Sequence, residues 1–164
     1  MEYGLIGERL GHSYSPAIHA QLGDYAYRLY ECPREKLGDF LKTGDFDGLN
    51  VTIPYKKAVL PCCAELSPMA AAIGSVNTLL RRPDSTLYGD NTDAFGFESL
   101  LRHAGLDPKG KKCLVLGSGG ASVTVQAVLR HLGAASVTVI SRSGEDNYHN
   151  LTRHQDAELI VNAT

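Results

Sequence analysis

Two serines, Ser13 and Ser15, place hydroxyl groups two residues apart at the expected start of a helix. Pro16 follows, and a serine before a proline is typical of a helix start with Ser15 as the N-cap. Two hydroxyls near the positive end of a helix dipole suit a carboxylate, which can accept a hydrogen bond from each. Taken alone, Ser15 is better explained as an N-cap without a ligand. His12 and His19 flank this segment, and we expect them to orient or pack rather than catalyse.

A second segment presents an amide and a hydroxyl on one side of a strand and then supplies an amine. Asn50 and Thr52 are two residues apart in the expected strand, and Lys56 follows shortly after it. Because side chains alternate along a strand, Asn50 and Thr52 share one face, while Val51 and Ile53 share the other. Taken alone, Lys56 is more typical of a solvated surface cation.

A glycine-rich turn lies between an apolar run and a helical pattern, Gly117-Ser118-Gly119-Gly120-Ala121-Ser122. Gly117 permits a tight turn, Gly119 lets the backbone approach a pyrophosphate, and the small Ser122 lets the helix pack close to its strand. The helix start offers free N–H groups and a partial positive charge to a phosphate. Such turns also serve as plain strand-to-helix corners, but a strand before and a helix after favour dinucleotide binding.

The next apolar run, 137–140, ends in Ser141-Arg142-Ser143. An NAD site usually has Asp or Glu at this place to bind the ribose 2′-hydroxyl. Arg142 can instead pair with the 2′-phosphate of NADP through bidentate, charge-assisted hydrogen bonds, and the two serines can add more. A solvated loop arginine is the alternative, and Glu145 or Asp146 could fold back toward the ribose.

Strand and helix signals alternate along the chain, which predicts the α/β class. We expect strands at 3–6, 25–30, 49–53, 76–80, 87–89, 113–116, 137–140 and 159–161, and helices from Ser15, from Pro33, around 58–66, at 68–73, at 94–104 and after the glycine-rich turn. We expect residues 1–104 to form a three-layer α/β substrate domain that ends in a connector helix, and residues 105–164 to form the first, incomplete half of a Rossmann domain.

Composition limits the function classes. The 164 residues carry a net charge of -2, with 43% hydrophobic and 21% charged residues, as in a globular protein with a core. This charge disfavours nucleic-acid binding, and the sequence shows neither a membrane span nor a signal peptide, so we expect a cytoplasmic protein. The four cysteines form no C-x-x-C pair and are expected as reduced thiols, and the histidine spacing predicts no metal site.

Four motifs occur together: S-x-S-P from Ser13, N-V-T-I-P-x-K from Asn50, I-G-x-V-N-T ending in Asn77-Thr78, and G-x-N-T-D ending at Asp93. Singly, the last two are readable as turn or cap chemistry. In this order and at these intervals the chain resembles the shikimate dehydrogenase family, from about Gly4 to Thr164.

The resemblance implies NADP-dependent, reversible reduction of 3-dehydroshikimate to shikimate, a step of aromatic amino acid biosynthesis. It implies that Lys56 and Asp93 form the catalytic pair, and that the other ligand contacts come from two sets. The substrate contacts are Ser13, Ser15, Asn50, Thr52 and Asn77, with Asp93 also at the ring hydroxyls; the NADP contacts are Gly117, Ser118, Gly119, Gly120, Ala121, Ser141, Arg142 and Ser143.

Two departures from the family pattern accompany the resemblance. Val123 stands where the family often has a basic residue after the glycine-rich turn. Family members also continue for about another half domain, so we expect the chain to be C-terminally truncated and weakly active by itself. The alternatives are a quinate/shikimate dehydrogenase of broader specificity, in which NAD could serve, and a non-catalytic ligand-binding protein. A homodimer is compatible with all three.

Overall fold

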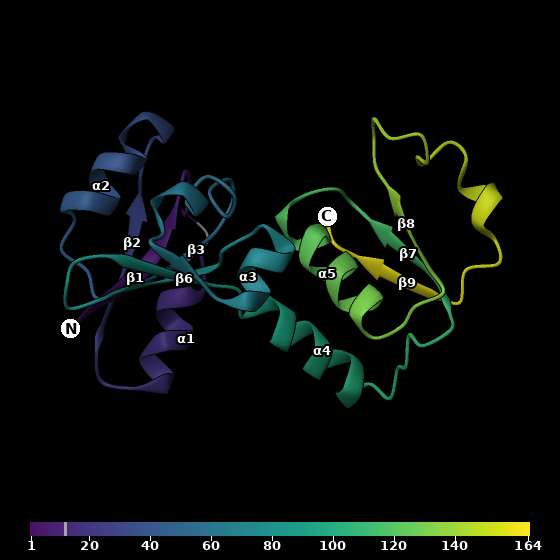
Figure 1. Ribbon diagram of the computed structural model, residues 1–164, viewed down its shortest axis with the longest axis horizontal. Helices are drawn as coiled ribbons and strands as arrows, with labels where there is room; N and C mark the ends of the chain where they lie inside the picture. Colours follow the sequence, from purple (N-terminus) through teal and green to yellow (C-terminus); the bar gives the residue numbers. More distant parts are fainter. Residues whose placement is uncertain (12) are drawn as a thin grey trace. The chain divides into compact units, whose positions relative to one another are not determined.

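The computed structural model describes residues 1–11 and 13–164, so the expectation for His12 lies outside the described residues. The chain divides into two compact units, Met1–Asn91 and Thr92–Thr164, each of the α/β class (Figure 1). The division falls 13 residues before the expected boundary at 104. The reason is the helix α4 (Asp93–His103), which packs on a helix of the second unit and buries Leu101 in that unit's core.

The first unit is built on a six-stranded sheet with the order β2-β1-β3-β5-β6-β4. Its elements in chain order are β1 (Glu2–Gly7), α1 (Ser15–Leu22), β2 (Ala26–Glu31), η1 (Arg34–Lys36), α2 (Leu37–Thr43), β3 (Gly48–Val51), η2 (Leu60–Cys62), β4 (Glu65–Leu66), α3 (Pro68–Ile73), β5 (Thr78–Arg81) and β6 (Leu87–Asp90). The sheet is mixed: β1 pairs in parallel with β2 and β3, and β4 with β6, whereas β5 is antiparallel to both its neighbours.

The main core of this unit lies on one face of the sheet. Side chains of β1, β3 and β5, among them Ile6, Leu49 and Leu79, pack there with Leu41 of α2 and Ala70 of α3. Helix α1 contacts β2 and supplies no residue to this core. The apolar alternation of the strands thus produces the expected layered α/β arrangement.

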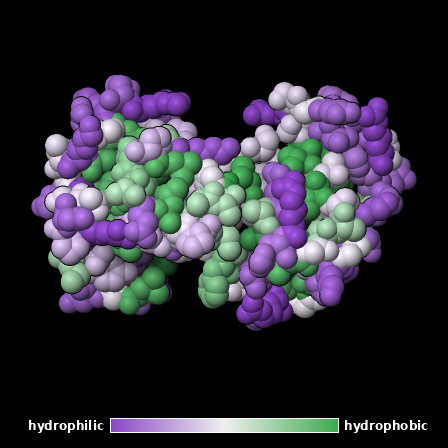
Figure 2. Space-filling model, viewed as in Figure 1, coloured by the Kyte–Doolittle hydropathy of each residue, from purple (hydrophilic) through white to green (hydrophobic). Residues whose placement is uncertain are grey.

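Helix α1 is an exception to burial, because none of its eight described residues is buried. Ile18 is 54% and Leu22 is 69% exposed. Hydrophobic residues are accordingly visible at the surface of the first unit, between hydrophilic ones (Figure 2).

Two local expectations were wrong in the first unit. Strand β3 ends at Val51, and Ile53 is 76% exposed instead of sharing Val51's buried face, because the chain turns there and Tyr55 N–H donates to the Thr52 carbonyl at 2.9 Å. The helix expected around 58–66 is replaced by turns, the short η2 and β4. Strand β4 pairs with β6, and this long-range pairing is absent from the local pattern.

The second unit continues from α4 with β7 (Lys112–Leu116), α5 (Gly120–His131), β8 (Ser136–Ile140), η3 (Leu151–His154) and β9 (Leu159–Asn162). Its three strands are all parallel, in the order β8-β7-β9. Val115 at the centre and Leu129 of α5 are fully buried, as the apolar runs predicted. The helix at 94–104 and the three strands lie within one or two residues of their expected positions.

Four thiols are free, as expected: Cys32 and Cys113 are buried, Cys63 is half-buried and Cys62 is exposed. Burial raises the pKa of Cys63 to about 11. Within residues 1–11 and 13–164, no helix is both long and apolar enough to cross a membrane.

Candidate functional site

Main-chain hydrogen bonds bring three of the expected site residues to one end of the first sheet. Asn50 of β3 is the register partner of Thr78 of β5, and the next residue, Val51, donates its N–H to the Asn77 carbonyl at 2.7 Å. The Val76 N–H donates to the Lys56 carbonyl at 2.8 Å. Asn50, Lys56 and Asn77 are therefore held together through the backbone, although up to 27 residues separate them.

Helix α3 fixes the approach of the chain to Asn77. Ser67 is its N-cap, and the Ser67 Oγ accepts a hydrogen bond from the Ala70 N–H at 3.0 Å. The helix ends at Gly74, whose φ of +67° is a left-handed conformation that favours glycine. Asn77 is 8% exposed, and its Oδ1 accepts a hydrogen bond from the Thr78 hydroxyl at 3.0 Å.

Lys56 follows a firmly anchored residue. Tyr55 is fully buried, its hydroxyl donates to the Cys32 carbonyl, and burial raises the pKa of its phenol. Lys56 itself is half-buried, whereas the adjacent Lys57 is exposed. This partial burial distinguishes Lys56 from a solvated surface cation, which was the alternative interpretation of the sequence.

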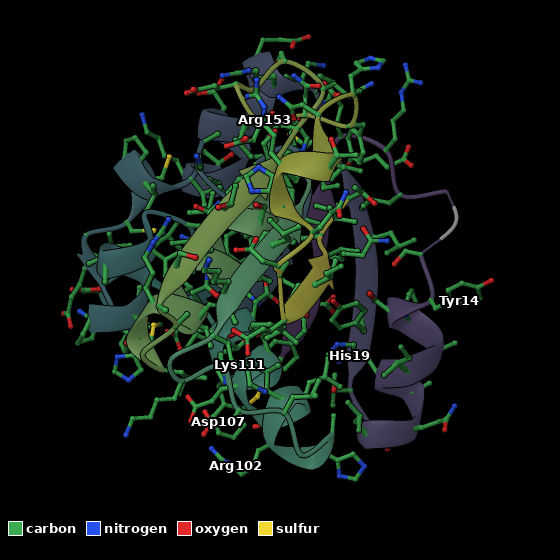
Figure 3. The ribbon with its side chains drawn as sticks, turned by 90° about the vertical axis from the view of Figure 1, so that its right-hand side faces the viewer. Tyr14, His19, Arg102, Asp107, Lys111 and Arg153 are labelled. Carbon is green, nitrogen blue, oxygen red and sulfur yellow. The ribbon has the colours of Figure 1, made fainter. Side chains whose placement is uncertain are left out.

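The serine segment starts its helix one residue earlier than expected. The N-cap of α1 is Tyr14, not Ser15, because the Tyr14 carbonyl is already an acceptor of the helix, bonded to the Ile18 N–H at 3.1 Å. Tyr14 is 81% exposed and projects outward (Figure 3). The Ser15 N–H donates to the Ser13 Oγ at 3.2 Å, so the two serines are neighbours as expected.

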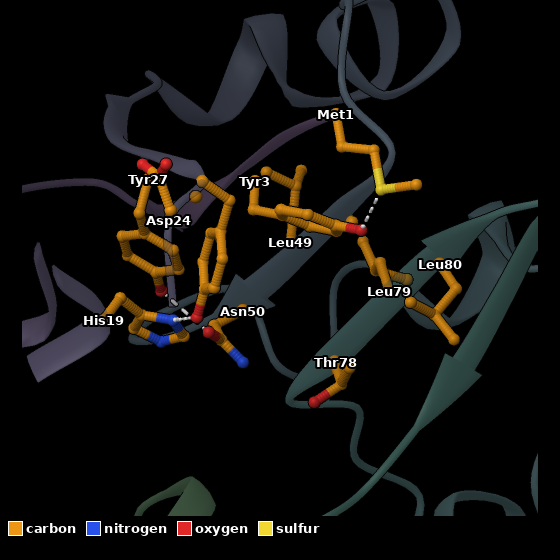
Figure 4. Close-up of a pocket in the computed structure, with 13 residues that line it drawn as sticks. Met1, Tyr3, His19, Asp24, Tyr27, Leu49, Asn50, Thr78, Leu79 and Leu80 are labelled. Carbon is orange, nitrogen blue, oxygen red and sulfur yellow. Dashed lines mark hydrogen bonds between the residues drawn. The ribbon is translucent and has the colours of Figure 1, made fainter. Parts of the chain in front are cut away.

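A cavity of about 450 Å³ opens on the sheet face opposite the main core (Figure 4). Tyr27, Asn50, Thr78 and His19 are among its lining residues. Burial raises the pKa of Tyr27 to about 12, and a hydrogen-bonding interaction with Ser15 lowers this pKa by a smaller amount. The sequence analysis missed Tyr27: alternation in the expected strand at 25–30 puts Tyr25 and Tyr27 on one face, but nothing local says which strands lie beside it.

The glycine-rich turn combines a left-handed glycine, open space and the start of a helix. Gly117 has a φ of +107°, and a Cβ there would lie 2.7 Å from the Ala163 carbonyl oxygen, so the segment after β9 passes too close for a side chain. Gly119 is the N-cap of α5, and a Cβ on it would meet no atom within 4 Å. Ser122 is fully buried, which agrees with close packing of the helix. Open space therefore lies beside Gly119, at the positive end of a 12-residue helix.

The loop after β8 leaves Arg142 and Ser143 exposed and Ser141 half-buried. It folds back on itself, and the Ser141 N–H donates to the Asp146 carbonyl at 3.2 Å. The Asp146 carboxylate, which could have turned toward a ribose, contacts His154 Nε2 at 2.7 Å. Arg142 is therefore exposed just after β8, while Asp146, one of its two acidic neighbours, contacts His154.

Asp93 lies in the second unit, in the first turn of α4. The two sets of expected residues thus divide between the units. The substrate residues Ser13 to Asn77 belong to the first unit, and Asp93 and the cofactor residues Gly117 to Ser143 belong to the second.

Comparison with known proteins identifies the family of the chain. The family model described as the shikimate dehydrogenase substrate binding domain matches residues 5–79. A crystal structure of shikimate 5-dehydrogenase from Thermus thermophilus, in complex with NADP(H) and shikimate, is 36% identical with a TM-score of 0.86; the alignment covers 100% of this chain and 68% of that one. The chain belongs to the shikimate dehydrogenase family.

Other members of the shikimate dehydrogenase family give the same result. Shikimate dehydrogenase 1 from Peptoclostridium difficile matches with 35% identity and a TM-score of 0.89, covering 99% of this chain and 67% of that one. The shikimate dehydrogenase (NADP(+)) of Halothermothrix orenii is 41% identical over 149 residues, which are 85% of this chain and 51% of the relative. The chain spans 51% of the length of this relative and 64% of the length of the shikimate dehydrogenase (NADP(+)) of Oleidesulfovibrio alaskensis.

Proposed function

We propose that this protein catalyses the reversible, NADP-dependent reduction of 3-dehydroshikimate to shikimate. The observation that carries the proposal is the backbone-held group of Asn50, Lys56 and Asn77 at one end of the first sheet. Family membership supports it, as do the names of the curated relatives and the shikimate bound in the Thermus structure.

In this proposal, polar groups of the first unit bind the substrate. Ser13 and Ser15 bind its carboxylate, and Asn50, Thr52 and Asn77 bind its ring hydroxyls. Lys56, as an ammonium group, stabilises the charge that develops on the carbonyl oxygen and donates a proton to it; in the reverse direction the neutral amine accepts that proton. Asp93 is the proposed partner that orients the amine and favours its charged form.

The glycine-rich turn fits a dinucleotide. Its open side lies at Gly119, where the missing Cβ leaves space for a pyrophosphate beside the α5 N-terminus. Gly117, Ser118, Gly119, Gly120 and Ala121 would hold the pyrophosphate, and Ser141, Arg142 and Ser143 the 2′-phosphate. When bound, NADPH supplies the hydride that reduces the ketone carbon. The contact of Asp146 with His154 supports NADP over NAD, because it engages a carboxylate that a ribose 2′-hydroxyl would need.

The test is a shikimate-dependent assay of NADP reduction by the full-length protein. Lys56→Met should lower kcat by about 10²–10⁴-fold, the range for loss of a general acid–base group, with a much smaller change in shikimate affinity. Lys57→Met is the matched control, since Lys57 is adjacent and exposed, and it should keep wild-type kcat. Near-normal turnover in Lys56→Met would assign that residue to the surface.

Broader specificity is a second candidate, supported by the likeness to quinate dehydrogenase from Corynebacterium glutamicum in complex with NAD, at 27% identity and a TM-score of 0.82. Parallel assays with quinate and with NAD separate the two: efficient quinate oxidation with NAD would favour the broader enzyme. Shikimate binding in calorimetry without turnover would instead indicate a ligand-binding protein. We place the enzyme in the cytoplasm, and sedimentation would test a homodimer.

A further inference from the structure

The phenol of Tyr27 connects two of the proposed substrate residues. Its hydroxyl donates to the Asn50 Oδ1 at 2.7 Å, and a hydrogen-bonding interaction with Ser15 lowers the pKa of the phenol against the effect of burial. The three residues come from different elements, since Ser15 begins α1, Tyr27 lies in β2 and Asn50 in β3. Because β1 separates β2 from β3, Tyr27 reaches across a strand to make this contact.

His19 holds the Tyr27 ring in this position. The two rings are stacked, with centroids 3.7 Å apart and an interplanar angle of 12°. The His19 ring also contacts Tyr25, since its Nδ1 lies 2.7 Å from the Tyr25 hydroxyl oxygen. His19, Tyr27 and Asn50 lie together at one end of the cavity (Figure 4).

The direction of the hydrogen bond between Tyr27 and Asn50 determines which end of the Asn50 amide meets the cavity. The hydroxyl of Tyr27 has a single proton, and that proton is donated to the Asn50 Oδ1. The amide oxygen of Asn50 is thereby engaged by a donor. Its amino group, which can only donate, is then the end presented to a ligand.

We propose that Tyr27 is a positioning residue that orients the Asn50 amide so that its amino group donates to an oxygen atom of the substrate. This proposal rests on the proposed function and adds a residue to it. Tyr27 acts through Asn50 and does not itself contact the reacting atoms. The site is consequently selective for ligands that place a hydroxyl or carbonyl oxygen, as an acceptor, opposite Asn50.

The kinetic test uses Tyr27→Phe, which removes the hydroxyl and keeps the ring that stacks on His19. We expect the KM for shikimate to rise about 10-fold, the equivalent of about 1.4 kcal/mol, with kcat and the KM for NADP changed less than about threefold. Tyr30→Phe is the matched control, because Tyr30 lies on the same strand but packs against the main core beside Phe40, and its KM should stay at the wild-type value.

A double-mutant cycle separates positioning from a merely structural role. In an Asn50→Ala background, Tyr27→Phe should raise KM less than about twofold, because the group on which it acts is gone. An unchanged KM in Tyr27→Phe, or the full 10-fold effect in the Asn50→Ala background, would overturn the proposal.

The orientation can also be measured without any substrate. The Asn50 side-chain amide resonances in a ¹⁵N spectrum should shift in Tyr27→Phe and stay in place in Tyr30→Phe. Failure of the wild-type protein to oxidise shikimate would therefore count against the proposed function only. Unchanged Asn50 resonances in Tyr27→Phe would refute the positioning role.

Discussion

Two glycines of the same turn should respond in opposite ways to replacement by alanine. Gly119 is the N-cap of α5 with a φ of -76°, and a Cβ there would enter open space. Gly117 has a φ of +107°, and a Cβ there would lie 2.7 Å from the Ala163 carbonyl oxygen. We therefore expect Gly119 to be required for ligand binding and Gly117 to be required for the stability of the fold.

For Gly119→Ala we expect little change in the free energy of unfolding. Alanine is a poorer N-cap than glycine, which costs roughly 0.5–1 kcal/mol. Its smaller unfolded-state entropy offsets this by about 0.4–1 kcal/mol. The added methyl group would occupy the space proposed for the pyrophosphate, so the Kd for NADP should rise at least about 10-fold, or 1.4 kcal/mol.

Gly117→Ala should instead destabilise the protein. A non-glycine residue in a sparsely populated backbone conformation costs about 1–3 kcal/mol, and the contact with a backbone carbonyl forces a further shift. Urea unfolding followed by circular dichroism measures the stability of both variants, and calorimetry with NADP measures binding. Wild-type NADP affinity in Gly119→Ala would refute the placement of the pyrophosphate, and wild-type stability in Gly117→Ala would refute the account of the turn.

Two further substitutions test separate contacts. Arg142→Ala should weaken NADP binding by about 1.5–3 kcal/mol and leave NAD binding nearly unchanged. Arg153→Ala is the control, because Arg153 is also exposed and lies in the same loop region. Equal losses of affinity for both cofactors would show that Arg142 acts on the fold. Ser67→Ala should lower the stability of the first unit by about 1 kcal/mol, because the hydrogen bond from Ala70 to the cap is lost, and an unchanged urea midpoint would contradict that role for the cap.

Local signals determined much of the fold. Helix α3 is bounded as the sequence predicted, because its cap serine, first-turn proline and terminal glycine act within the segment itself. Strand β7 was equally predictable, since a strand buried on both faces needs a continuous apolar run. The tight turn at Gly117 also follows from a residue type that tolerates its positive φ.

Features that depend on distant partners were not predictable in the same way. Residues around 58–66 form turns and a short strand, because the pairing of β4 with β6 outweighs a local helical pattern. The sequence left two choices open for Asp146, and only the fold of its loop places the carboxylate against His154. The residues of helix α4 were predicted correctly, but the helix was assigned to the first domain and belongs to the second unit. Its packing partner α5 lies further along the chain, so the local pattern could not show this.

The sequence by itself determined which residue types are available for chemistry: the paired serines, the amides, Lys56, the glycine-rich turn and Arg142. Only the tertiary structure decided how their hydrogen-bonding groups are oriented. The Tyr27–Asn50 contact joins residues 23 apart across an intervening strand, and it exists because the sheet order is β2-β1-β3. Sheet order is set by the burial of the whole domain and not by any local segment, so this contact could not be read from the spacing of residues.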